Sequence, residues 1–134
     1  MPASARLFLS LGGGALLAAV VLGAFGAHAL KARLAPELLT VFRTGVEYHF
    51  YHAFGLLAVG LLALHLPESG WLRASGWMMA SGIVFFSGGL YLLALTGVRT
   101  LGAVAPAGGV AFMLAWALFL VAVLKAPQLP RPTP

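Results

Sequence analysis

The segment TGVEYHFYHAFGLL, residues 44–57, gathers the side chains that are best suited to chemistry in this sequence. Histidine and tyrosine donate and accept hydrogen bonds, histidine also binds metals, and a carboxylate pairs with arginine. On a helix, His52 shares a face with both Tyr48 and His49, whereas Glu47 points away from His52. The spacing therefore favours a polar helix face built around His52.

The histidines also limit the metal chemistry that the chain could perform. His49 and His52 offer two imidazoles on one face and His28 a third, but no Glu-x-x-His pair of the carboxylate di-metal type occurs. Because cysteine is absent, thiol catalysis, disulfides, thiolate zinc sites and iron–sulfur clusters are excluded. A single haem between His28 and His52 stays open as an alternative, but neither a metal nor a cofactor is expected.

The composition indicates a membrane protein. Of the 134 residues, 61% are hydrophobic and 8% charged, with a mean hydropathy of +0.99, whereas about a quarter of the residues of a soluble domain are charged. The net charge of +5 would suggest nucleic-acid binding in a soluble protein. Here the basic residues stand singly at the ends of apolar runs, so lipid headgroups are the expected partner and nucleic acid is not.

Four apolar stretches are long enough to cross a hydrocarbon core of about 30 Å, which takes roughly 20 helical residues. They cover about 7–29, 46–66, 71–96 and 103–124. The first exceeds the roughly 7–15 apolar residues of a signal peptide, which favours an uncleaved span. The sequence thus predicts an all-α integral membrane four-helix bundle, a single domain over residues 1–126, followed by a Pro-rich tail over 127–134 that is not helical.

Residues 31–44, KARLAPELLTVFRT, show a different pattern. Leucine, valine and phenylalanine recur there at helical spacing, and charged residues occupy the other face. This pattern predicts a short interfacial amphipathic helix over about 35–44, between spans one and two, with Pro36 in its first turn.

An up-down arrangement of four spans brings polar side chains from four helix ends to one leaflet. Ionisable groups inside a membrane are costly, which makes them candidates for function. The candidate binding residues are His28, Glu47, Tyr48, His52, Ser87, Tyr91 and Arg99. No residue is a candidate for catalysis.

Two contacts are expected within this set. His28 and His52 should lie close together with Tyr91 near them. Glu47 should pair with Arg99 or Arg43, since an unpaired carboxylate entering the membrane would lose several kcal/mol of solvation. The alternative interpretation is an interfacial aromatic belt, which is favoured for Tyr51 and His49.

Four ordered motifs make the chain similar to a known family. They are GAFGAHALK at 23–31, F-x-T-x-V-x-Y-x-x-x-HA at 42–53, FSGGLY at 86–91 and PAGG at 106–109. The chain resembles the YgdD-like small membrane proteins, a domain-of-unknown-function family (423), up to about Val123. The resemblance implies four spans in a bacterial inner membrane and no established activity, substrate or cofactor. Relatives often carry Gln at the position of His49, which makes His49 the weaker candidate for a shared role.

The leading functional hypothesis is a non-enzymatic membrane protein that binds another protein or assembles with copies of itself, because a small glycine-rich bundle has little else to offer. The second hypothesis is a binder or carrier of a lipid, quinone or small solute, in a pocket lined by His28, His52, Tyr91 and Arg99. Metal or haem binding ranks third.

Overall fold

The computed structural model describes residues 1–127 of the chain, and within that range the chain is all α-helical, without a strand. Residues 128–134 of the predicted tail lie outside the described residues. The elements are α1 (Ala3–Phe25), the π-helical turn η1 (Gly26–Leu30), α2 (Pro36–Leu62), α3 (Gly70–Gly82), the π-helical turn η2 (Ile83–Ser87), α4 (Gly88–Thr96), the 3-10 helix η3 (Arg99–Val104) and α5 (Ala105–Leu124).

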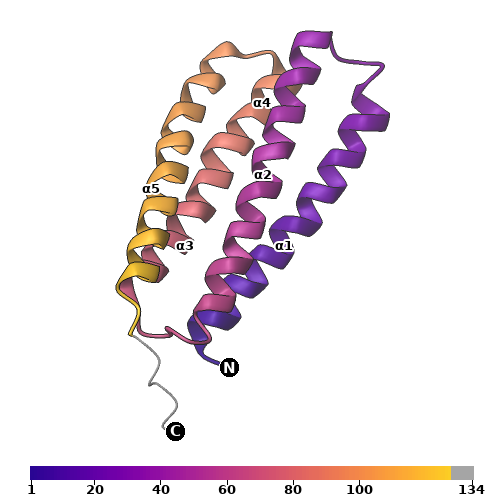
Figure 1. Cartoon of the computed structure of the whole chain (residues 1–134). Helices are drawn as coiled ribbons and strands as arrows, with labels where there is room; N and C mark the ends of the chain where they lie inside the picture. The colour runs from indigo at the N-terminus through magenta and orange to yellow at the C-terminus, as the bar shows by residue number, and fades with distance from the viewer. Residues whose placement is uncertain (128–134) are drawn as a thin grey trace, which may run out of the picture.

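These elements join into four long rods that lie side by side (Figure 1). η1 extends α1, η2 links α3 to α4 without a break, and η3 leads directly into α5. α2 packs along α1 on one side and along the α3–α4 rod on the other, and α3 packs along α5. The N-terminus and the end of α5 lie at the same end of the molecule, which we call the terminal end (Figure 1).

Among residues 1–127, three rods are long and apolar enough to cross a membrane: Ala3–Leu30, Gly70–Thr96 and Arg99–Leu124. α2 is of similar length, with 27 residues. The polar stretch TGVEYHFYH, residues 44–52, lies around the middle of α2 and lowers the mean hydropathy of the helix. α2 therefore differs from its neighbours in composition rather than in length.

The prediction of a separate interfacial helix over about 35–44 needs correction. Residues 36–44 form the first turns of α2, which continues unbroken to Leu62. Pro36 begins the helix, as its fixed φ favours, and no second proline interrupts the helix before Leu62. The helix that contains the predicted second span, 46–66, accordingly begins earlier, at Pro36, and ends at Leu62.

The apolar face of these first turns packs on protein rather than on the membrane surface. Leu39 and Phe42 are buried in a cluster with Leu30 from η1 and Ala94 from α4. The amphipathic pattern thus correctly indicated a helix, but neighbouring helices cover the face that was assigned to lipid.

Candidate functional site

Four polar side chains are buried in the described part of the chain: His49, His52, Ser75 and Ser87. Ser75 donates a hydrogen bond to the carbonyl of Ala115, 2.8 Å away, and so ties α3 to α5. Ser87 Oγ, in η2, is the one buried side-chain oxygen or nitrogen without a hydrogen-bond partner in residues 1–127. The two histidines come from α2 and have different surroundings.

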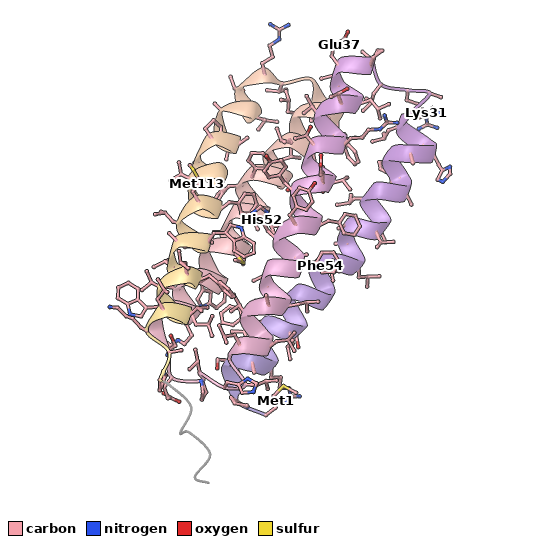
Figure 2. The ribbon with its side chains drawn as sticks, viewed as in Figure 1. Met1, Lys31, Glu37, His52, Phe54 and Met113 are labelled. Atoms are coloured by element: carbon pink, nitrogen blue, oxygen red, sulfur yellow. The ribbon has the colours of Figure 1, made fainter. Side chains whose placement is uncertain are left out.

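His52 is enclosed by aromatic rings. Its imidazole stacks on Phe112 of α5, with ring centroids 3.3 Å apart and planes 9° apart, and it points from α2 toward α5 (Figure 2). Nδ1 lies 2.7 Å from the carbonyl oxygen of Tyr48. Because a carbonyl only accepts, Nδ1 carries the proton and the imidazole is anchored to its own helix. His52 therefore belongs to the packing between α2 and α5.

His49 pairs with Tyr91 across the α2–α4 contact. Nδ1 of His49 lies 3.1 Å from the Tyr91 hydroxyl. Gly45 makes this approach possible, because a Cβ there would lie 2.8 Å from the Tyr91 ring. Phe42 packs against the Tyr91 ring, with ring centroids 4.9 Å apart. The pair is thus positioned by one helix face that runs from Phe42 to His49.

His49 also lines an open groove between α1, α2 and the α3–η2 segment. The groove has a volume of about 360 Å³, and its walls include Ser10, Leu11 and Gly14 of α1 and Ile83 and Val84 of η2. His49 stands at the centre of α2, about 20 Å from either end. We call this feature the His49 groove. It places an imidazole at the middle depth of the helices, beside an apolar opening.

The other predicted site residues are scattered. Tyr48 is partly exposed and packs its ring on Phe86, at 4.7 Å between centroids. Arg99 is exposed at the start of η3, and His28 is exposed on η1. The structure therefore brings together His49 and Tyr91, but it does not bring His28 or Arg99 to them.

The expected contact between His28 and His52 is wrong. His28 lies near the start of α2, since only residues 31–35 connect η1 to that helix. His52 lies about 24 Å along α2 from Pro36, and its ring neighbours come from α2 and α5. The end of η1 and the start of α2 do lie at the same end of the molecule, as expected. His52 lies too far along α2 to be part of that end.

The predicted pairing of Glu47 with arginine is also wrong. Glu47 is exposed and accepts a hydrogen bond from the Tyr51 hydroxyl, one turn further along α2. Neither Arg43 nor Arg99 forms an ion pair with it in the described residues. A phenol within reach on the same helix supplies the hydrogen bond without tying two helices together.

Replacing Glu47 by glutamine is therefore expected to lower the melting temperature of the full chain no more than Glu37→Gln does. The glutamine oxygen can accept the same hydrogen bond, and exposed substitutions usually change stability by less than about 0.5 kcal/mol. Thermal unfolding of both variants in one detergent checks this. A clearly larger loss for Glu47→Gln would mean that the carboxylate is paired in a way the structure does not show.

No metal centre forms within residues 1–127, where no three His, Asp or Glu side chains group closely enough to hold an ion. The residue that sequence reasoning underrated is His49. A signal was present, because Phe42, Gly45, His49, His52 and Leu56 recur at spacings of three and four and all are buried. That face predicts an inward His49.

Comparison with known proteins confirms the predicted family. Residues 22–109 match the family described as "Protein of unknown function (DUF423)". The chain is 48% identical to the UPF0382 membrane protein YwdK of Bacillus subtilis over 120 residues, which cover 90% of this chain and 98% of the relative. It is 42% identical to the UPF0382 membrane protein SERP0230 of Staphylococcus epidermidis over 124 residues, 90% and 97% of the two chains. No solved structure matches.

The named relatives and the three apolar rods agree on the class of protein. The relatives carry the words "membrane protein" in their names, and the three rods are long enough to cross a membrane. This is a multi-pass membrane protein. Because the family profile covers most of the chain and the relatives nearly all of it, the chain belongs to the DUF423 family of membrane proteins of unknown function.

Proposed function

We propose that this chain is a non-enzymatic, four-span membrane protein that binds a lipid-soluble molecule in the His49 groove. α2 would be the fourth span: its 27 residues extend about 40 Å, and it packs between rods of the same length. Its polar side chains His49 and His52 are buried against protein, which makes a bilayer location tolerable for them.

The buried position of His49 is the observation that carries the proposal. An ionisable side chain at the middle of a membrane domain is costly and marks a functional site by default. One ring nitrogen is used by Tyr91. The other, Nε2, makes no hydrogen bond within residues 1–127, although its side chain lines an open groove. A bound molecule that forms a hydrogen bond with Nε2 would give both ring nitrogens of His49 a hydrogen-bond partner.

The groove defines the chemical class of this molecule. Its walls are leucine, isoleucine, valine and alanine side chains, apart from Ser10, Gly14 and His49. Its volume falls in the usual range for small-molecule sites, about 300–1,000 Å³. Neutral imidazole offers a donor or an acceptor at Nε2, according to which of Tyr91 and His49 donates to the other. The fitting ligand is therefore uncharged and apolar, with one carbonyl or hydroxyl group.

The lining also favours binding over catalysis. The groove offers one histidine and a serine, without a carboxylate or second base among its walls. A serine nucleophile must be hydrogen-bonded to the base that activates it, and within residues 1–127 the hydrogen bond of the His49 ring is made with Tyr91 and not with Ser10. The Tyr91 hydroxyl, which is hydrogen-bonded to Nδ1 of His49, orients the imidazole ring.

The test is retention of a lipid-soluble compound by the purified full chain. Wild-type protein, extracted from its host membrane in mild detergent, should carry one recurrent compound in organic extracts analysed by mass spectrometry. His49→Phe keeps a ring of similar size but loses the nitrogen, and should lower retention about tenfold, the equivalent of one hydrogen bond of about 1.4 kcal/mol. His49→Gln keeps a hydrogen-bonding group and should retain the compound.

A second variant separates the loss of ligand binding from a loss of protein stability. His49→Phe leaves the Tyr91 hydroxyl without its partner, which lowers stability by about 1–3 kcal/mol. The double variant His49→Phe, Tyr91→Phe removes that orphan group. Equal retention by wild type and both phenylalanine variants, or the lack of any recurrent compound in wild type, would contradict the proposal.

Association with another helix is the second candidate, and α1 favours it. Ser10, Gly14 and Ala18 are exposed at four-residue spacing, and a Cβ on Gly13 or Gly14 would meet nothing within 4 Å. Small residues at this spacing let transmembrane helices approach closely. A second copy or a recurrent protein partner in the same purification, lost on Ala18→Leu, would favour this candidate over the ligand.

A further inference from the structure

A second groove lies at the terminal end, between the start of α1, the loop after α2 and the first turns of α3. It has a volume of about 410 Å³ and its walls include Leu7, Phe8, Glu68, Arg73 and Trp77. None of these residues lines the His49 groove. Both grooves follow the same α1–α3 side of the molecule, but this one is at the end of the helices.

The two charged side chains of this groove have opposite signs and are both free. Glu68 precedes α3 and Arg73 lies in the first turns of that helix. Both are exposed, and they form no ion pair with each other within residues 1–127. A guanidinium binds phosphate through paired N–H donors, and a carboxylate accepts hydrogen bonds from an ammonium. The groove thus presents separate partners for an anion and for a cation.

The inner wall of the groove is apolar and aromatic. Phe8 and Trp77 meet edge to face with centroids 5.9 Å apart, and Trp77 remains about half exposed. Tryptophan is enriched where membrane helices meet the headgroup region. Because these residues lie within about two turns of the ends of their helices, the groove is at headgroup depth, with the charges outside and the rings toward the bilayer.

We propose that this groove binds the headgroup of a phospholipid that carries a phosphate and a primary ammonium. The phosphate contacts Arg73, the ammonium contacts Glu68, and an acyl chain lies against Leu7, Phe8 and Trp77. A quaternary ammonium has no N–H to donate to Glu68, and a headgroup whose only charge is the phosphate leaves Glu68 without a partner. The site therefore prefers phosphatidylethanolamine to phosphatidylcholine and to phosphatidylglycerol.

The experiment measures lipid retention by native mass spectrometry. The full chain is reconstituted in an equimolar mixture of the three phospholipids with identical acyl chains. The protein is then released from the bilayer in the mass spectrometer, and the lipids that stay bound to it are counted. Wild type should retain phosphatidylethanolamine over phosphatidylcholine by about threefold, as expected for a partly exposed charge pair. Arg73→Gln should lower retention of all three lipids, and Glu68→Gln should bring the ratio of the first two to about one.

Arg99→Gln and Glu37→Gln are the matched controls, because they make the same chemical changes on exposed residues at the other end of the molecule. Circular dichroism of all four variants checks that each one keeps the helical content of wild type. Wild type without a preference, or either groove variant with the same retention as its control, would overturn the proposal. Lipid retention in this groove does not depend on His49. The headgroup proposal can therefore be wrong while the proposed function is correct, and the proposed function can be wrong while the headgroup proposal is correct.

Discussion

Replacing Gly108 by alanine should lower the melting temperature far more than the same change at Gly109. Gly108 lies where α5 crosses η2, and a Cβ there would overlap the backbone nitrogen of Phe86 and lie 2.7 Å from its Cα. Backbone cannot rotate away, so α5 must move off η2. Overpacking of this kind costs about 1–3 kcal/mol. A Cβ on Gly109 would meet the Phe86 ring at 3.8 Å, an ordinary contact.

Thermal unfolding of the two variants in one detergent measures the difference directly. Both positions are glycines, and they are adjacent on the same helix. Gly109→Ala therefore controls for the change in helix propensity. Equal melting temperatures would mean that α5 and η2 do not touch where the structure places them.

The second large effect is expected from Gly14→Leu, which should remove most of the compound bound in the His49 groove. Gly14 lines the groove and Gly13 does not. A Cβ on either glycine would meet no atom within 4 Å, so both leucine variants should fold. The leucine at residue 14 would occupy the ligand's space and lower retention about tenfold, the equivalent of 1.4 kcal/mol. Gly13→Leu should retain the compound.

Quantitative mass spectrometry of organic extracts from the two purified variants decides this prediction. A loss in both variants would show that leucine on α1 disturbs the helix generally. Unchanged retention by Gly14→Leu would show that the compound is bound somewhere other than the groove.

The helical class and the membrane setting were predictable because long apolar runs leave few alternatives. Residues 31–44 were harder, since an apolar stripe at helical spacing fits a surface helix and the start of a packed one equally well. What decides is whether another helix covers the stripe, as Leu30 and Ala94 cover Leu39 and Phe42 here. Part of that information lies in α4, which follows residues 31–44 only after the whole of α2 and α3.

The site was predictable in part for a related reason. Helix order correctly indicates which ends meet, and Tyr91 does lie beside α2. Depth along a helix and the choice of partner are decided by local packing: Gly45 admits the Tyr91 ring next to His49, and Tyr51 reaches Glu47 before any arginine does.

The proposed function requires that the His49 groove hold one specific lipid-soluble molecule. The most direct measurement is native mass spectrometry of the wild-type full chain, released from bilayer particles made with its own host membrane. We expect a peak for the chain with one additional small molecule, of the same mass in every preparation and distinct from the bulk phospholipids. A spectrum that shows the chain alone, or only adducts in proportion to the bulk lipids, would contradict the proposed function.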